Sequence, residues 1–249
     1  MRSLTSALKK FSDEQGHKGM QAVILAAGVG KRISSSHDTP KILLKFEGKT
    51  LLERHIANLR KVGTDRIIIC VGYKQEMIGR ALEKMESHNI EMISNEDFCL
   101  GSTVSLLKAR PIASKGVDTL VMDADVLYHP EIISKLVSTP QENCLLIDKE
   151  FDQDVEPVKV CIKNRKIVEF RKKISPKIDY DTIGESVGFF KFSTSGLEKI
   201  FQKCQKLFAT GREDSPHEEA IRESIIYDGL QMSFEDISSL PWIEIDFPE

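Results

Sequence analysis

The sequence lacks a hydrophobic run of the length that a membrane span needs. None of its apolar segments approaches the ~20 residues of a transmembrane helix, and the N-terminus lacks the apolar region of a signal peptide. The formal net charge is -3, so the chain has no basic excess to attract nucleic acid or an acidic membrane. We therefore expect no nucleic-acid partner and no membrane insertion.

Cysteine is also scarce. The chain has 5 cysteines, and they form neither a CxxC pair nor the spacing of a secreted disulfide framework. The two at positions 70 and 161 fall inside apolar strand patterns. This usage indicates reduced thiols and a cytoplasmic protein. Internal repeats and low-complexity tracts are absent as well, which excludes a repeat architecture.

The pattern that is present alternates strands with helices. Helical periodicity covers 49–62, 75–85 and 103–109, and short apolar strands cover 66–71, 90–93 and 119–122. Repeated β-α units predict an α/β fold with a three-layer, mostly parallel sheet. A chain of 249 residues with 41% hydrophobic composition can bury one such domain. Ligands of these sheets bind at the carboxyl ends of the strands.

A glycine-rich, cationic loop follows the first strand. The apolar run from Val23 to Ala27 predicts a central strand, and Gly28 and Gly30 allow consecutive backbone N–H groups to converge on an anion. Arg32 and Lys41 add the positive charge that a triphosphate needs. The loop matches neither the dinucleotide fingerprint nor the Walker loop.

Carboxylates end two further apolar segments. Asp123 and Asp125 close the strand at 119–122, and Asp246 closes the segment that begins at Trp242. An Asp at the carboxyl end of a strand points to the binding edge of the sheet, and buried carboxylates are costly without a cation. The alternative role for the first pair is in a turn and a helix cap before Pro130. The six histidines show no metal or catalytic spacing and are interpreted as surface residues: His17, His37, His55, His88, His129 and His217.

The motif Ala-Ala-Gly-x-Gly-x-Arg at 26–32, with Pro-Lys at 40–41 and Gly-Lys-Thr-Leu-Leu at 48–52, resembles the nucleotidyltransferase family with a Rossmann-like fold. The resemblance covers nearly everything from residue 20 to 249. It implies catalytic roles for Lys41, Arg32 and Asp125, and Mg²⁺ ligation by Asp125 and Asp246. The nucleotide-binding positions that it implies are Leu25, Ala26, Ala27, Gly28, Gly30, Lys31, Arg32, Gly101, Ser102 and Asp123. A plain helix-cap role for Thr103 and Ser105 is an equal alternative to base contact at 101–102.

Residues 1–19 are interpreted as a flexible N-terminal extension and 20–249 as the nucleotidyltransferase domain. Within it, 20–140 would bind mainly the nucleotide and 141–235 mainly the acceptor, and 240–249 would supply the second metal ligand. Alternation at 158–163 and 167–170 predicts a hairpin, with a further strand at 184–192; in the family such an antiparallel excursion covers the acceptor substrate. Pro248-Glu249 resembles a helix start, so we expect a further helix or domain beyond it.

The resemblance is strongest to phosphocholine, aminoethylphosphonate and inositol-phosphate cytidylyltransferases. It implies CTP and a small phosphorylated alcohol or phosphonate as partners, in-line attack on the α-phosphorus, pyrophosphate release, and a homodimer as the expected assembly. Glu185, Glu218 and Glu219 would bind an amine on the acceptor, although the last two could equally lie on an exposed helix face. A sugar-1-phosphate nucleotidyltransferase that uses UTP, dTTP or GTP, and a catalytically silent nucleotide-binding module, are the alternatives.

Overall fold

The computed structural model describes residues 19–29, 39–113, 116–152 and 157–245. Of the residues with an expected role, Gly30, Lys31, Arg32 and Asp246 lie outside these ranges, and so do residues 1–18.

Four parallel strands form the centre of the sheet. Strand β1 (Met20–Ala26) lies between β4 (Arg66–Val71) and β6 (Asp118–Asp123), and β5 (Ile90–Ser94) lies outside β4. Successive side chains of β1 enter the two opposite hydrophobic clusters of the protein, Ile24 in one and Val23 in the other. An uninterrupted apolar run is what a strand needs when both of its faces are buried.

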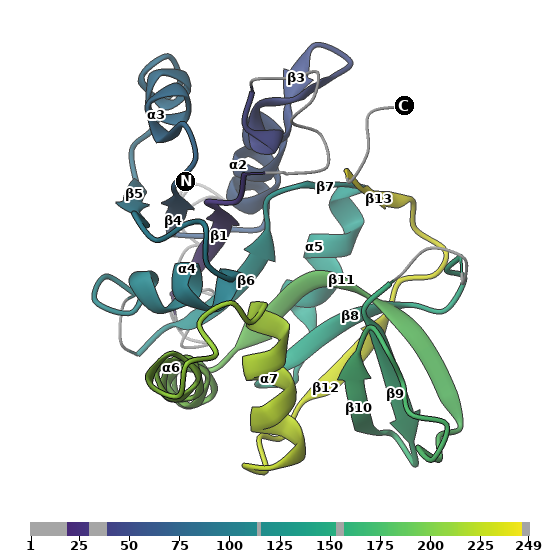
Figure 1. Cartoon of the computed structure of the whole chain (residues 1–249). Helices are drawn as coiled ribbons and strands as arrows, with labels where there is room; N and C mark the ends of the chain where they lie inside the picture. Colours follow the sequence, from purple (N-terminus) through teal and green to yellow (C-terminus); the bar gives the residue numbers. More distant parts are fainter. Residues whose placement is uncertain (1–18, 30–38, 114–115, 153–156, 246–249) are drawn as a thin grey trace, which may run out of the picture.

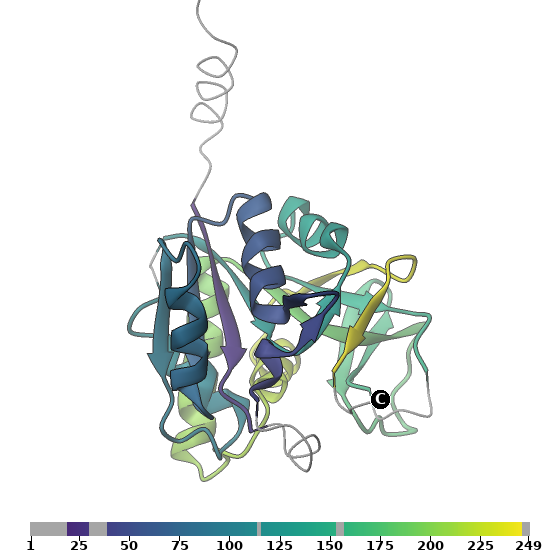
Figure 2. The same ribbon diagram turned by 90° about the horizontal axis from the view of Figure 1, so that it is seen from above.

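Helices cover both faces of this sheet (Figures 1 and 2). Helices α2 (Leu51–Lys61), α3 (Gln75–Glu83) and α5 (Pro130–Ser138) contribute to one cluster. Helices α4 (Ser102–Ala109), α6 (Thr194–Ala209) and α7 (His217–Ile226) contribute to the other. The predicted three-layer α/β architecture is confirmed.

Helix α2 begins two residues later than the sequence pattern suggested. Lys49 and Thr50 form strand β3 (Lys49–Thr50), which pairs with β2 (Lys45–Phe46). The Thr50 side chain then accepts a hydrogen bond from the backbone N–H of Glu53, and the Glu53 carboxylate accepts one from the backbone N–H of Thr50. This capping box fixes where the helix starts.

Strand β11 (Thr182–Phe192) carries the sheet beyond the carboxyl ends of the parallel strands. It runs antiparallel to β6 with Phe189 opposite Met122, and its first half pairs with β9 (Lys159–Lys163). β9 and β10 (Lys166–Arg171) form the predicted hairpin, in which Asn164 and Arg165 both have positive φ, 49° and 63°, as a two-residue type I′ turn requires. On its other edge β11 pairs with β8 (Cys144–Asp148), which pairs with β12 (Ser233–Asp236).

The end of the described chain returns to the carboxyl end of β6. Strand β13 (Trp242–Glu244) pairs antiparallel with β7 (Val126–Tyr128), which follows β6 directly. The short 3₁₀ helix η1 (Lys41–Leu43) completes the elements. Across the part of the chain that the structure describes, no helix combines the length and the apolar character needed to cross a membrane.

Candidate active site

A pocket lies at the carboxyl ends of β1 and β6. Its lining joins the start of the glycine loop, η1, the start of α4 and the end of β6. Eight of the residues with an expected role contribute to it: Leu25, Ala26, Ala27, Gly28, Lys41, Ser102, Asp123 and Asp125. Ala26 and Asp123, the last residues of β1 and β6, meet there because parallel strands present their carboxyl ends at one edge of the sheet. Lys41 lies there beside Asp125, from which it is 84 positions away in the chain.

Lys41 and Asp125 form an ion pair in this pocket. The Lys41 ammonium lies 2.8 Å from Asp125 Oδ2, and the two side chains are 17% and 24% exposed. Pro40 directly precedes η1, and its carbonyl accepts the hydrogen bond from Leu43 that closes the 3₁₀ turn. A cation and a carboxylate are thereby held together where a ligand can reach both.

Asp123 lies close to Gly188 of β11 on one side and to several other carboxylates. Gly188 on β11 has φ of +77°, and a Cβ there would lie 2.3 Å from Asp123 Oδ2. Only glycine allows this approach. Burial, and then the nearby carboxylates of Glu218, Asp125 and Glu244, raise the pKa of Asp123 well above its usual value, and Lys41 acts in the opposite direction. The site therefore has an excess of negative charge that a cation would relieve.

His217 is a residue of this site that the sequence interpretation missed. Its side chain is 1% exposed, so the prediction that it lies on the surface is wrong. Its Nδ1 lies 3.0 Å from Ser102 Oγ and 3.1 Å from Glu218 Oε2, and its Nε2 lies 4.0 Å from Asp123 Oδ1. It joins the start of α7 to the pocket.

The prediction of a surface position is also wrong for His55. The ring is fully buried, and its Nε2 lies 3.0 Å from the carbonyl oxygen of Ala124. Burial lowers the pKa of His55 to about 4, so the neutral ring donates to the backbone between the two aspartates. The signal was available in the sequence, because position 55 lies within the buried stripe of α2 at 51, 52, 55, 56 and 59.

The start of α4 is built by packing rather than by a side-chain cap. Gly101 is the N-cap residue, and a Cβ on it would lie 2.0 Å from the carbonyl oxygen of Ser215. Thr103 donates to the Pro216 carbonyl, and Ser105 Oγ accepts from Asn95. The cap roles considered for Thr103 and Ser105 are therefore wrong. Gly101 has a structural reason to be glycine, and Ser102 faces the pocket.

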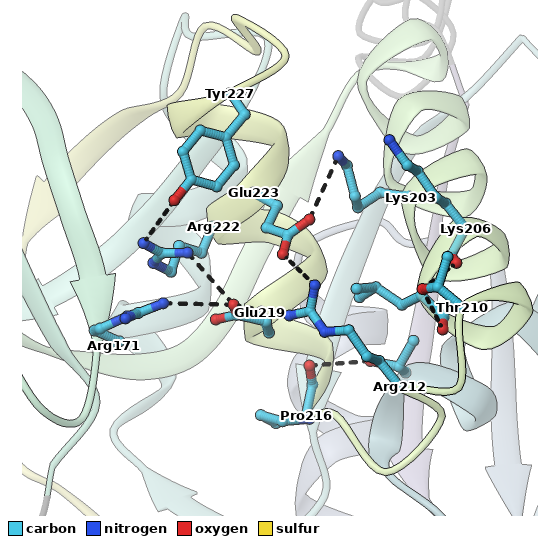
Figure 3. Close-up of polar contacts among 12 residues, drawn as sticks. Arg171, Lys203, Lys206, Thr210, Arg212, Pro216, Glu219, Arg222, Glu223 and Tyr227 are labelled. Carbon is cyan, nitrogen blue, oxygen red and sulfur yellow. Dashed lines mark hydrogen bonds and ion pairs between the residues drawn. The ribbon is translucent and has the colours of Figure 1, made fainter.

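The three glutamates expected at the acceptor lie in different surroundings. Glu218 is the one beside Asp123. Glu219 forms ion pairs with Arg171, Arg212 and Arg222 (Figure 3). The structure does not bring its carboxylate to the pocket, so Glu219 is not part of the acidic site.

The third glutamate, Glu185, lies on β11 opposite Asp148 of β8. Burial, followed by the repulsion of Asp148, raises the pKa of Glu185 to about 7. Asp148 also accepts a hydrogen bond from the indole Nε1 of Trp242 at 2.8 Å. Glu185 is three residues before Gly188, a separation of about 10 Å along a strand. This second acidic pair therefore lies away from Asp123, in the part of the sheet formed by β8 to β12, which we call the antiparallel lobe.

The C-terminal strand approaches Asp125 through the backbone. The N–H of Ile245 donates to the carbonyl oxygen of Asp125 at 2.8 Å. Asp246 is the next residue in the chain and lies outside the described residues. The position of Ile245 is therefore the structural support for the proposal that Asp246 and Asp125 bind the same metal ion.

Two relatives show what the chain is similar to in sequence. It is 24% identical over 253 residues to the CTP:phosphoglutamine cytidylyltransferase of Campylobacter jejuni, covering 92% of this chain and 96% of the relative. It is 27% identical over 239 residues to the bifunctional IPC transferase and DIPP synthase of Rubrobacter xylanophilus, covering 94% of this chain but 51% of the relative. The chain thus spans about half the length of that bifunctional protein.

The structure is similar in fold to the inositol-1-phosphate CTP transferase from T. maritima, with a TM-score of 0.76, 22% identity, and coverage of 93% of this chain and 91% of the other. In sequence, residues 22–175, more than half of the chain, match the MobA-like NTP transferase domain. These residues hold the glycine loop, Lys41 and both aspartates of the pocket. As the opening motif predicted, the chain belongs to this family of nucleotidyltransferases.

Proposed function

We propose that the protein is a Mg²⁺-dependent cytidylyltransferase, which joins CTP to a small phosphorylated alcohol or phosphonate and releases pyrophosphate. The observation that carries this proposal is the Lys41–Asp125 pair, 2.8 Å apart, in the lining of the pocket of an NTP transferase domain. Similarity to a CTP:phosphoglutamine cytidylyltransferase in sequence and to an inositol-1-phosphate CTP transferase in fold supports CTP as the nucleotide.

In the proposed reaction, an oxygen of the acceptor's phosphate or phosphonate attacks the α-phosphorus of CTP in line. The bond from the α-phosphorus to the bridging oxygen breaks, and the electron pair leaves with pyrophosphate. The enzyme's contribution is positioning and charge stabilisation. Lys41 would neutralise the charge that develops at the α-phosphorus. The backbone N–H groups of the loop, together with Arg32, would bind the leaving pyrophosphate.

The donor set fits Mg²⁺. The carboxylate of Asp125 is partly exposed to the pocket, and acidic side chains surround its neighbour Asp123. Mg²⁺ prefers oxygen ligands, commonly one or two carboxylates with substrate phosphates and water. Asp125 and Asp246 would hold the ion, and Glu244 is close enough to influence the same group of charges. When bound, the ion supplies charge neutralisation between two groups of phosphate oxygens.

For the acceptor, we place an amine-binding role on two carboxylates. Glu218 lies beside the pocket, and Glu185 forms an acidic pair with Asp148 in the lobe. A carboxylate such as Glu185, whose pKa is raised by burial and by a neighbouring carboxylate, is stabilised in its charged form by a cation such as an alkylammonium group. The indole of Trp242 is fixed against Asp148 by its hydrogen bond, and its ring face could pack on the same cation.

The test is pyrophosphate release with CTP, UTP, dTTP and GTP, each combined with phosphorylated amino alcohols, phosphorylated polyols, aminoalkylphosphonates and sugar 1-phosphates. The proposal expects turnover with CTP and a non-sugar acceptor, abolished by a chelator and restored by Mg²⁺. Preference for UTP, dTTP or GTP with a sugar 1-phosphate would replace it with a sugar nucleotidyltransferase. Binding of CTP without turnover on any acceptor would indicate a silent module.

A further inference from the structure

A second cation site emerges from the residues around His217. Asp123, His217 and Glu218 each offer one ligand atom, and these atoms lie within 4.8 Å of one another. The imidazole Nε2 of His217 is buried and has no hydrogen-bond partner among the residues that the structure describes. It faces Asp123 Oδ1 across 4.0 Å. A buried, unpaired ring nitrogen aimed at a carboxylate needs a partner between them.

The other ring nitrogen decides which proton the imidazole carries. Nδ1 lies 3.1 Å from Glu218 Oε2 and 3.0 Å from Ser102 Oγ. Ser102 Oγ is the hydrogen-bond partner of Nδ1, and the negative charge of the nearby Glu218 carboxylate disfavours a lone pair on that nitrogen, so the favoured tautomer has its proton on Nδ1. The lone pair of Nε2 then faces Asp123. In a metal-bound histidine, a hydrogen bond at the other ring nitrogen fixes the tautomer and the orientation of the ring, and here Ser102 Oγ supplies that bond.

The 4.0 Å gap between His217 Nε2 and Asp123 Oδ1 is too long for a direct hydrogen bond and leaves room for a shared ion. A direct hydrogen bond between nitrogen and oxygen spans about 2.7–3.2 Å. Two bonds of about 2.0–2.2 Å to one divalent transition metal span about 3.3–3.6 Å in a tetrahedral site and about 4.0–4.4 Å when the ligands lie on opposite sides of the ion. Oδ2 of Asp123 lies against the position that a Cβ of residue 188 would occupy, and Oδ1 is the oxygen that faces the histidine.

The local charge also favours a cation. The carboxylates of Glu218, Asp125 and Glu244 all act on Asp123, and Lys41 acts in the opposite direction. The positive end of α7, where His217 is the first helical residue, offsets about half of one charge.

We propose that Asp123 and His217, supported by Glu218, bind a divalent transition metal such as Zn²⁺ or Co²⁺, separate from the Mg²⁺ expected at Asp125. Imidazole nitrogen suits these ions better than Mg²⁺, which prefers oxygen alone. The ion would tie the start of α7 to the end of β6 and hold Ser102, which contacts His217, at the pocket. The site involves this chain's residues only and requires no nucleotide.

The experiment titrates Co²⁺ into chelator-stripped protein in excess Mg²⁺, without nucleotide, and follows visible absorption and calorimetric heat. We expect one Co²⁺ per chain with a nitrogen-ligand spectrum. His217→Gln should weaken binding by about 100-fold or more, and Glu218→Gln by about 10–100-fold. His129→Gln, at an exposed histidine, is the matched control and should bind as the wild type does.

Absence of saturable Co²⁺ binding by the wild type, or equal binding by His217→Gln, would overturn the site. A bridging proton or water would give that same negative result. If His217→Gln does not fold, NMR of wild-type protein labelled with ¹⁵N in the histidine rings gives the answer. Zn²⁺ should shift the Nε2 resonance of one buried histidine, and an unshifted set would refute the proposal. Pyrophosphate release plays no part in either readout, so failure here leaves the cytidylyltransferase proposal standing.

Discussion

Glu218 and Glu219 are neighbours on α7 with nearly equal exposure, 18% and 19%, yet they lie in opposite electrostatic surroundings. Glu219 faces Arg171, Arg212 and Arg222 (Figure 3). Glu218 faces His217 and, beyond it, Asp123. Consecutive residues at a helix start point about 100° apart around the axis, so one helix contributes to two different charge clusters.

The cluster around Glu219 balances its charges internally. Glu169 accepts two hydrogen bonds from Arg222, and the two side chains are 8% and 5% exposed. Lys203, also 5% exposed, lies between Glu223 and Asp228. These pairs tie α7 to β10 and α6. The pocket cluster instead gathers carboxylates around Asp123 and raises its pKa. Balanced buried charge is typical of architecture, and unbalanced charge at a pocket is typical of ligand binding.

The largest effect should come from removing a carboxylate of the acidic cluster at the pocket. Asp125→Asn should lower kcat on the order of 10³-fold, because the proposed metal loses a charged ligand. Asp246→Asn should match it, and the double variant should be little worse than either, since members of one catalytic unit are not additive. Pyrophosphate release measures the effect. Asp118→Asn, at the opposite end of the same strand, is the control, and additive losses would separate the two residues.

Substitutions in the cluster of ion pairs around Glu219 and Arg222 should act mainly on the free energy of unfolding. Glu169→Ala leaves the Arg222 guanidinium buried without its carboxylate, and the free energy of unfolding should fall by about 3–5 kcal/mol. Urea denaturation measures it. A change below about 1 kcal/mol would mean that water satisfies Arg222 and that the cluster does not hold α7 in place.

Lys41→Ala should leave the fold intact and lower turnover about 100-fold or more, because it removes the positive charge expected at the α-phosphorus. Lys45→Ala changes an exposed lysine on the neighbouring strand and should be without effect. Circular dichroism would establish folding beside the kinetic assay. Near-normal kcat in a folded Lys41→Ala variant would remove Lys41 from the mechanism and make its pair with Asp125 structural.

The features that could be predicted from the sequence are those determined by residues close together in the chain. The apolar run before the glycine loop, the Asn164-Arg165 turn and the strand that ends at Asp123 each depend on neighbouring residues. Period and turn chemistry suffice for them. The stripe that buries His55 is equally local, and its histidine was misjudged because polar residues are usually exposed.

The partners of the site residues depend instead on contacts between distant segments. Ser102 and His217 are 115 positions apart, and Gly188 meets Asp123 only because β11 reverses beside β6. The difference between Glu218 and Glu219 depends in the same way on Arg171 and Arg212, which come from a hairpin and a loop. No periodicity within α7 contains that information.

Neutralising Glu218 and Glu219 separately tests the comparison between them directly. Glu219→Gln should lower the free energy of unfolding by about 1–2 kcal/mol, since it leaves three arginines with less negative charge. Glu218→Gln should change stability by less than about 0.5 kcal/mol and raise the KM for an amine-bearing acceptor while that for CTP stays the same. Urea denaturation and steady-state kinetics on both variants provide the readout. The comparison fails if the two variants behave alike.

The smallest expected effect concerns Glu185, whose pKa is raised to about 7, first by burial and then by Asp148. The folded state then holds a proton that the unfolded state releases near pH 4.5, so native protein binds more protons between these values and stability falls as pH rises from about 4.5 to about 7. Because the side chain is partly exposed, we expect the loss to be about 1 kcal/mol. Glu185→Gln should remove that slope, so urea denaturation at about pH 5 and about pH 8 should show a gain over wild type at the higher pH alone. Parallel pH profiles for the two proteins would mean that Glu185 is solvated like a surface carboxylate. If an amine-bearing acceptor abolishes the difference in stability between Glu185→Gln and wild type at about pH 8, its cation binds at Glu185 and Asp148. The antiparallel lobe would then hold a second group of carboxylates whose charge is neutralised by a ligand.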